Sequence, residues 1–457
     1  MLIRNRSRFY LQGNLSGKLR NATLIYILVL VILNQVMHFI RKQCPSLNIP
    51  TGWPVSEGAF ELPSRGLGVF TAVACVCLAS YFWWKGSKIV WGLRNIVCFA
   101  VLLLLLGNAT KGISWGYEAP LVSIRQGETH YYDDAVQLPS SAIVLADYTK
   151  MQPAFGMHSR SHPPGPLLAM KFARMLLQSP ILISALFGTL NLALACTLMY
   201  LLLRRLSMDS VNSRMLTMLY ATMAAIQIYY LFSIDAIICT LGIALLLSIH
   251  HSSKSYRILT SAFFLWALMM MTFGALFYVP VILWLTWERY RRIGEAVATC
   301  ALTILALIAM YWGFGFNYLQ SFQIANHFEN PGGFMLFSQP GSYLTTRLEN
   351  IGDIIYFIGP AITYFLWMGF TMRDGSTTER YWMRLGKIGI SVLIMVFLTG
   401  AYRTGETGRA CLFILPFIIL TIAPSVKRIV TPNNFRTLAI WVILHTLLLQ
   451  ILGFYYW

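Results

Sequence analysis

The chain has 457 residues, of which 57% are hydrophobic and only 11% are charged, and its mean hydropathy is +0.62. Soluble globular domains carry roughly 25% charged residues, so this composition argues against a soluble protein and predicts an all-α, multi-pass membrane protein. A net charge of +18 could indicate a nucleic-acid-binding protein, but the positions of the basic residues argue against that class.

Apolar runs close to the roughly 20 residues that span a bilayer recur along the chain. The first run follows a basic N-terminus and lacks a small-x-small cleavage site, so we expect a retained helix with a cytoplasmic N-terminus. We expect about 11–13 transmembrane helices, at residues 22–40, 67–84, 91–107, 181–203, 215–232, 235–249, 258–271, 273–287, 297–313, 351–369, 388–401, 410–425 and 437–455.

These helices divide the charged residues unequally between the two sides of the membrane. Of the 35 Lys and Arg residues, 23 fall inside and 12 outside, whereas the 17 acidic residues divide 5 and 12. An excess of basic residues marks the cytoplasmic side. We therefore expect a plasma-membrane or inner-membrane protein whose positive charge sets its topology and attracts anionic lipid headgroups. Membrane lipids, and not nucleic acid, are the expected partners.

Two long polar stretches are expected on the outer side, at residues 108–180 and 315–350. The first contains an acidic and aromatic cluster, Gly-Glu-Thr-His-Tyr-Tyr-Asp-Asp, which ends at Asp134. About 30 residues later comes His-Ser-Arg-Ser-His-Pro-Pro-Gly-Pro, which begins at His158. The prolines predict a rigid entry into an amphipathic helix lying in the membrane interface. The aromatic second stretch is interpreted either as a lid over an amphiphilic ligand or as a solvated loop.

A carboxylate in the first large outer loop, followed by a His-Pro-Pro element and an interfacial helix, resembles the polyprenol-dependent GT-C glycosyltransferases. Protein O-mannosyltransferases and aminoarabinose transferases share that plan. The sequence His162-Pro-Pro-Gly-Pro, with a late Gly-Glu-Thr-Gly-Arg ending at Arg409, looks like bacterial family-39-like members. The resemblance implies a GT-C-like catalytic module at 91–457, preceded in 1–90 by a basic N-terminus and two additional transmembrane helices.

The resemblance also implies a glycosyltransferase that moves a sugar from a polyprenyl-phosphate donor to a glycan, lipid or protein acceptor on the outer face. Such a transfer needs a carboxylate that takes the proton of the acceptor while the acceptor attacks the anomeric carbon. Asp133 and Asp134 are the first candidates for this base, and Glu128 is the third. The alternative is that these acids cap a helix or are solvated in the loop.

The leaving group would be a phosphate, for which guanidinium is the best-suited side chain. We expect Arg409, Arg403 and Arg160 to bind it, and His162 to hydrogen-bond to phosphate or sugar. Arg409 could instead pair only with an acid three residues earlier on a helix. His162 could instead pack in the proline-rich turn. The spacing of four from His158 could also suggest a metal site, but the following prolines argue against a regular helix there.

Further side chains are expected to line the substrate cavity: Glu406, His158, Tyr132, Asp235 and His327. Asp235 could alternatively be the N-cap of the next helix. We expect no obligatory cofactor, and a divalent metal is left open. The rival functions are a transporter or flippase of lipid-linked sugars and a non-catalytic scaffold. A transporter predicts charged residues deep within several spans, whereas the apolar runs hold almost no acids apart from Asp235 and Asp353 near helix ends.

Overall fold

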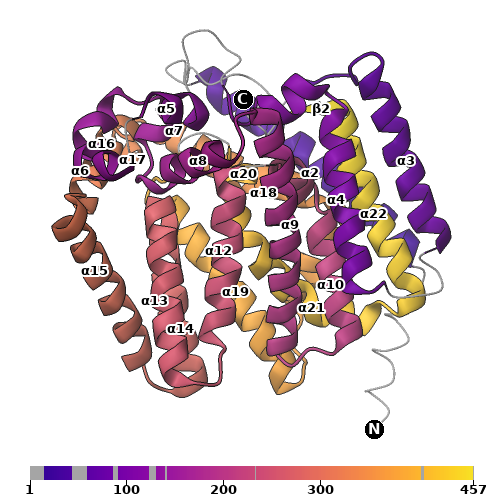
Figure 1. Ribbon diagram of the computed structural model, residues 1–457. Coiled ribbons are helices and arrows are strands. Elements are labelled where there is room, and N and C mark those ends of the chain that lie inside the picture. The colour runs from indigo at the N-terminus through magenta and orange to yellow at the C-terminus, as the bar shows by residue number, and fades with distance from the viewer. Residues whose placement is uncertain are drawn as a thin grey trace.

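The computed structural model describes residues 15–43, 59–85, 91–122, 130–138, 141–231, 233–402 and 406–455. It shows an all-α polytopic membrane protein in which long helices stand side by side and short helices cover one end (Figure 1). Within the described residues, eight helices are long and apolar enough to cross a bilayer. They are α2 (Leu15–Gln43), α3 (Leu67–Lys85), α9 (Pro180–Arg205), α15 (Gly294–Phe314), α18 (Pro340–Thr371), α19 (Thr377–Leu398), α21 (Leu415–Ile429) with the 3₁₀ turn η4 (Leu412–Ile414), and α22 (Pro432–Leu452).

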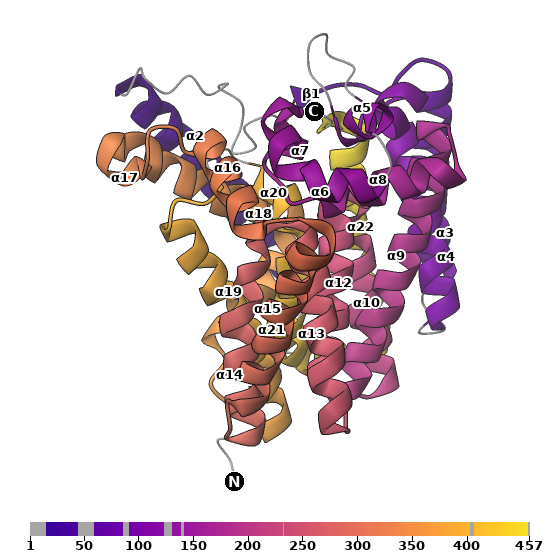
Figure 2. The same cartoon turned by 60° about the vertical axis from the view of Figure 1, so that its left-hand side comes forward.

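Shorter upright helices fill the spaces between these eight and correspond to the remaining expected spans (Figures 1 and 2). They are α4 (Leu93–Ala109), α10 (Ser210–Thr222), α11 (Ala224–Tyr229), α12 (Ile234–Ile249), α13 (Lys254–Met271) and α14 (Tyr278–Tyr290), with the 3₁₀ turn η3 (Phe273–Phe277) between the last two. The helical segments therefore lie where the apolar runs predict them, although in the described part of the chain only eight are both long and apolar enough to cross a bilayer.

The two long loops fold into short helices that lie together at one end of the bundle, which we call the site end (residues 110–179 and 315–339; Figure 1). The first loop forms the π-helical turn η1 (Ser114–Glu118), α5 (Tyr131–Gln137), α6 (Ser141–Met151), the 3₁₀ turn η2 (Gln152–Ala154), α7 (Met157–Arg160) and α8 (Gly165–Leu176). The second forms α16 (Tyr318–Glu329) and α17 (Met335–Ser338), and α20 (Thr407–Ala410) lies at the same end.

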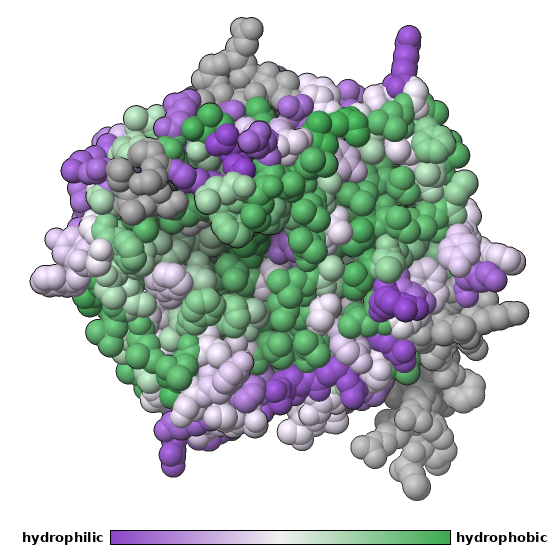
Figure 3. Space-filling view, viewed as in Figure 1, coloured by the Kyte–Doolittle hydropathy of each residue, from purple (hydrophilic) through white to green (hydrophobic). Residues whose placement is uncertain are grey.

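The surface matches this layout, because an apolar band crosses the middle of the molecule between two polar ends (Figure 3). At the end opposite the site end, ion pairs join neighbouring helices. Arg257 on α13 lies 2.8 Å from Glu295 on α15, and Arg428 on α21 lies 2.7 Å from Glu379 on α19. These pairs fix the register of helices whose apolar faces alone would allow sliding.

Helices α10 and α11 form one span that is broken inside the bundle. Met223 adopts an extended conformation, with φ −62° and ψ 144°, so the regular ladder of backbone hydrogen bonds is interrupted there. An unpaired carbonyl within a bilayer is costly. Polar side chains satisfy the freed groups, since Thr446 of α22 donates to the Thr222 carbonyl at 2.6 Å and the Gln227 amide donates to the Ala221 carbonyl at 2.5 Å. At the end of α11, Asn108 of α4 donates to the Gln227 carbonyl at 2.8 Å. The break is thus locked by α4 and α22.

Helix α18 is kinked at Gly359 and Pro360. Gly359 has φ +79°, which favours glycine, and Pro360 lacks the N–H that would bond the Tyr356 carbonyl four residues earlier. Two distant side chains take over that bond. Tyr26 on α2 donates to the Tyr356 carbonyl at 3.0 Å, and the His445 Nε2 on α22 lies 2.8 Å from the same oxygen.

The two N-terminal helices belong to the same bundle as the rest of the chain. Helix α2 packs on α18 and α22, and α3 packs on α4 and α22. The short strand β1 (Ala59–Phe60) pairs antiparallel with β2 (Gly453–Phe454). Nearby, the buried Lys111 ammonium donates to the carbonyl oxygens of Glu61 and Ile451. The segment before α3 is therefore joined to the end of the described chain at the site end.

Candidate functional site

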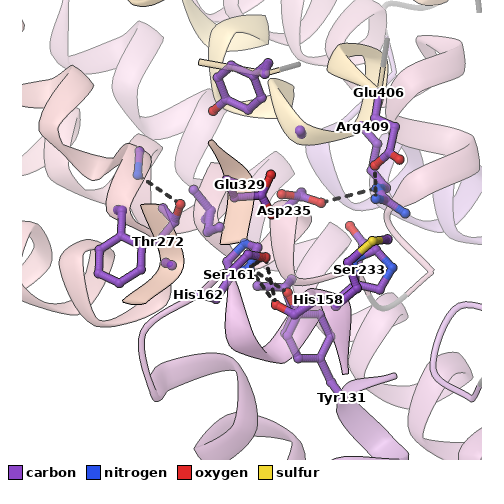
Figure 4. A pocket seen from close by; sticks show the side chains of 18 of the residues that line it. Tyr131, His158, Ser161, His162, Ser233, Asp235, Thr272, Glu329, Glu406 and Arg409 are labelled. Atoms are coloured by element: carbon purple, nitrogen blue, oxygen red, sulfur yellow. Dashed lines mark hydrogen bonds and ion pairs between the residues drawn. The ribbon is translucent and has the colours of Figure 1, made fainter. Parts of the chain in front are cut away.

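A cavity of about 570 Å³ opens at the site end, where the loop helices meet α12, α20 and the η3 turn. Its walls combine apolar side chains with a set of polar groups drawn from distant parts of the sequence (Figure 4). The polar and titratable lining residues include His130, Tyr131, His158, Ser161, His162, Ser233, Asp235, Thr272, Asn326, Glu329, Asn330, Tyr402, Glu406 and Arg409. A mixed cavity of this size is typical of small-molecule and cofactor sites.

Arg409 is the charged centre of this cavity. Its Nη2 lies 2.5 Å from the Glu406 carboxylate, and its Nε lies 3.6 Å from the Asp235 Oδ2 (Figure 4). Burial alone would lower the pKa of Arg409, but the two carboxylates more than offset burial and raise it. The guanidinium is therefore permanently charged. With five N–H donors in a fixed plane, it can hold a carboxylate and a further oxyanion at once.

Asp235 reaches the cavity from the first turn of α12. Ser233, not Asp235, is the N-cap of that helix, because the Ser233 hydroxyl accepts from the Ala236 N–H at 3.1 Å. The N-cap interpretation of Asp235 is therefore wrong, and its carboxylate lines the cavity instead. An acid in a first helical turn is stabilised by the helix dipole, so this carboxylate is held in place by its own helix as well as by Arg409.

Two histidines of the His-Pro-Pro segment form the neighbouring wall. The rings of His158 and His130 stack at 4.7 Å. His162 Nδ1 lies 2.9 Å from the His158 carbonyl and 3.1 Å from the Tyr131 hydroxyl. Burial lowers the pKa of His162 to about 4, and burial together with the nearby Arg409 charge lowers the pKa of His158. Both imidazoles are neutral at pH 7. Since the carbonyl fixes the proton on Nδ1, the His162 Nε2 is a hydrogen-bond acceptor.

The two adjacent acids of α5 have other positions. The Asp133 carboxylate accepts the His130 backbone N–H at 3.0 Å and forms the capping box of the helix. Asp134 is buried and accepts the Gly156 N–H at 3.2 Å, which ties α5 to the turn before α7. Neither lines the cavity. Their neighbour Tyr131, the first residue of this short helix, does.

Helix α16 closes the cavity on the side of the second loop. Its residues Phe322, Asn326 and Glu329 line the cavity from one helical face. The helix is held against the first loop, since the Gln152 amide donates to the Ser321 carbonyl at 3.1 Å and the Arg160 guanidinium stacks on Phe328 at 4.5 Å. Arg160 therefore joins α7 to α16 outside the cavity lining.

A turn at residues 397–402 forms another wall and is organised by a buried arginine of α18. Arg347 donates to the carbonyl oxygens of Phe397, Ala401 and Tyr402, at 2.8 Å for the last two. Asn350 also donates to the Tyr402 carbonyl, at 3.1 Å. Tyr402 adopts φ +58°, which is uncommon for a tyrosine. The hydrogen bonds from Arg347 and Asn350 explain why the backbone holds that conformation at the cavity.

A second, nearly apolar groove of about 480 Å³ lies between α8, α13 and α15. It is lined by Leu145, Gly165, Leu168, Leu241, Trp266, Ala267, Met270, Met271, Met310 and Phe314. Consecutive residues face the two hollows, since Met271 lines the groove and Thr272 lines the cavity. Helix α8 gives its buried face to the core and exposes Phe172 and Met175, which suits the interfacial position expected for it.

The structure brings together five residues expected from the sequence and separates others. Asp235, His158, His162, Glu406 and Arg409 all line the cavity. Asp133, Asp134, Tyr132, Arg160 and His327 do not; the Tyr132 hydroxyl donates to the Gln178 carbonyl at 2.6 Å, and the exposed His327 packs edge-on against Phe328. Glu128 and Arg403 lie outside the described residues. Tyr131 and Arg347 were missed, although a helical projection of residues 131–134 could have separated Tyr131 from Asp133.

No cluster of three or more His, Cys, Asp or Glu side chains suited to a metal ion occurs in the part of the chain that the structure describes. No protein-family model, curated protein or solved structure matches the chain.

Proposed function

We propose that this protein is an integral membrane glycosyltransferase that moves a sugar from a polyprenyl-phosphate donor to an acceptor, with its cavity on the outer face of the plasma or inner membrane. The observation that carries the proposal is the convergence of Asp235, Glu406 and Arg409 with two neutral histidines around one cavity beside an apolar groove. A lipid-linked sugar phosphate needs these features together: an apolar path, a fixed cation and a carboxylate. The GT-C-like resemblance of the sequence points to the same chemistry.

Asp235 is the residue we propose as the base, in place of Asp133 and Asp134, because it faces the cavity. The acceptor hydroxyl oxygen attacks the anomeric carbon and forms the new C–O bond. The bond from the anomeric carbon to the phosphate oxygen breaks, and its electron pair leaves with the polyprenyl phosphate. The acceptor proton moves to the Asp235 carboxylate. General-base catalysis of this kind contributes about 10²–10⁴-fold to the rate.

Arg409 is the proposed phosphate ligand. Negative charge grows on the leaving phosphate as the bond breaks, and a preorganised guanidinium stabilises that charge without reorganisation. Glu406, 2.5 Å from the guanidinium, holds it in place. The acceptor nitrogen of His162 cannot bind a phosphate oxygen, so we assign His162 to a hydroxyl of the sugar instead.

The apolar groove is the proposed path for the first isoprene units of the donor. A charged headgroup lies in the polar cavity, and the attached chain leaves it across Met270 and Met271 toward the lipid. Because the groove is apolar, the first isoprene units stay out of water while the headgroup lies in the polar cavity, which avoids a cost of about 0.8 kcal/mol per exposed CH₂ group.

Purified protein in lipid nanodiscs tests the proposal with farnesyl phosphate as the probe. Arg409→Ala is expected to weaken binding about 10- to 100-fold, the loss of a charge-assisted contact. Arg174→Ala is the matched control, because that guanidinium stacks on Tyr132 away from the cavity. Transfer or hydrolysis of farnesyl-phosphoryl [¹⁴C]sugars by the wild type is the second readout. Equal farnesyl phosphate affinity in the wild type and both variants would remove Arg409 from this role.

One observation favours a second candidate, a flippase of lipid-linked sugars. Glu349 and Asp353 are almost completely buried in α18, and Asp353 accepts the Gly408 N–H beside the cavity. Asp353 was expected near a helix end, but α18 begins at Pro340 and places it well inside the helix. Liposomes separate the two functions: a flippase moves a fluorescent lipid-linked sugar between leaflets without cleaving it, and a glycosyltransferase cleaves it.

A further inference from the structure

Helix α16 presents an ordered row of hydrogen-bonding groups to the cavity. Phe322, Ala325, Asn326 and Glu329 all line it, at the spacing of three and four residues that defines one helical face. Asn330, directly after the helix, lines it too. None of these positions belongs to the charged centre on α12 and α20.

The amides of this face are oriented by each other. The Asn330 Nδ2 donates to the Asn326 Oδ1 at 2.9 Å, and the Asn330 backbone N–H donates to the Asn326 carbonyl at 2.8 Å. This pairing leaves Asn326 offering its Nδ2 donors and Asn330 offering its Oδ1 acceptor. The Glu329 carboxylate adds a strong acceptor beside them.

Such a mixture selects one chemical class of ligand. A phosphate only accepts hydrogen bonds and an ammonium only donates them, so each would match half of the groups. A hydroxyl both donates and accepts, and neighbouring hydroxyls of a sugar match alternating donors and acceptors. The aromatic ring of Phe322 on the same face adds an apolar surface for the C–H side of a sugar ring.

The cavity-facing side of α16 and the proposed donor path lie on different elements. Asn326 and Glu329 are exposed, so this wall is reached from water. The apolar groove, by contrast, is formed by other elements and contains no residue of α16. The helix is also fixed before any ligand arrives, through Ser321 and Phe328, which reduces the entropic cost of binding.

We infer that the face of α16 formed by Asn326, Glu329 and Asn330 is the acceptor subsite and recognises a hydrophilic, hydroxyl-bearing acceptor such as a glycan. The inference rests on the proposed function and assigns the specificity of the second substrate. Water, which needs no recognition, could replace the acceptor in a slow hydrolysis of the donor.

The partition between transfer and hydrolysis tests the subsite. With a farnesyl-phosphoryl [¹⁴C]sugar as donor and a panel of methyl glycosides as acceptor probes, Asn326→Ala and Glu329→Gln are expected to lower kcat/KM for the glycoside about 10- to 100-fold. Hydrolysis and the donor KM are expected to stay within about twofold, because the donor is held elsewhere. Gln323→Ala is the matched control, since that residue is exposed on the same helix outside the cavity lining. An unchanged partition, or a donor KM that rises in parallel, would overturn the subsite.

A binding measurement keeps the two proposals distinguishable. Saturation-transfer NMR of the same methyl glycosides, with the wild type in nanodiscs, is expected to show contact that Asn326→Ala and Glu329→Gln remove and Gln323→Ala retains. If that result is found without turnover of any donor, the glycosyltransferase proposal fails while the hydroxyl-binding face stands. If the wild type shows no contact with any glycoside, the subsite is refuted.

Discussion

Replacing Asp235 by Asn is expected to change donor binding and turnover in opposite directions. Its Oδ2 lies 3.6 Å from the Arg409 Nε. At an effective dielectric constant of about 20, two unit charges at that distance interact by about 4–5 kcal/mol, which is an upper bound in a cavity open to water. Without the Asp235 charge, Arg409 interacts more strongly with the phosphate of the donor. If that interaction gains roughly 1–2 kcal/mol, farnesyl phosphate binds about 5- to 30-fold more tightly to Asp235→Asn.

Turnover of the same variant is expected to fall about 10²–10⁴-fold, because an amide cannot accept the acceptor proton. Isothermal titration with farnesyl phosphate and single-turnover transfer measure the two quantities on one preparation. Asp147→Asn is the control, since that exposed carboxylate pairs with Lys150 outside the cavity. A parallel loss of affinity and turnover would indicate that Asp235 only maintains the structure. Normal turnover would refute its role as the base.

Four further outcomes follow from the structure. Asp133→Ala removes the capping box of α5 and is expected to lower the free energy of unfolding by about 0.5–2 kcal/mol with turnover retained; a loss of turnover at unchanged stability contradicts this. The pKa of His162 is held at about 4 by burial, below the ordinary value, so the unfolded chain alone binds a proton between about pH 6.5 and 4. Thermal stability should therefore fall from pH 7 toward pH 5, and an equally steep slope in His162→Gln would oppose this assignment. Gly359→Ala places a Cβ in steric conflict with the His445 ring at φ +79°, and a loss of roughly 1–3 kcal/mol is expected in thermal unfolding; no loss would mean the kink relaxes freely. Met310→Trp fills the apolar groove, so farnesyl and undecaprenyl donors should both lose kcat/KM, whereas a donor with a methyl group in place of the prenyl chain should not; equal losses for the methyl donor would place the chain elsewhere.

The membrane fold was predictable because its signal is local. A run of apolar residues predicts a membrane span. Every run predicted from the sequence corresponds to a helix or to a helix broken inside the bundle. Helix ends were harder. Helix α18 begins at Pro340 instead of near residue 351, since its first turns are polar and are buried by the 397–402 turn. Hydropathy cannot report a polar helix that is covered by protein.

The site could be predicted only for residues whose chemistry alone suggests their role, whatever their position in the fold. Arg409 and His162 were found from their motifs, and both line the cavity. Asp133 and Asp134 have suitable chemistry, but Asp133 caps α5 and the Asp134 carboxylate accepts the Gly156 N–H, so Tyr131 is the residue of α5 that lines the cavity. The bond from Asp134 to Gly156 joins segments 22 residues apart. It depends on how α5 packs against its neighbours, which is a tertiary contact with no signature in a single sequence.

The kink of α18 has a consequence for biogenesis. The carbonyl of Tyr356 is bonded by Tyr26 from α2, which is synthesised more than 300 residues earlier, and by His445 from α22, which is synthesised about 90 residues later. As α18 leaves the ribosome, only the first of these partners has been made. The oxygen thus stays half-satisfied in the bilayer until α22 inserts. Closure of the bundle around Tyr356 is therefore a late step. A chain arrested before α22 would present a helix with an incompletely bonded carbonyl, which quality control could recognise.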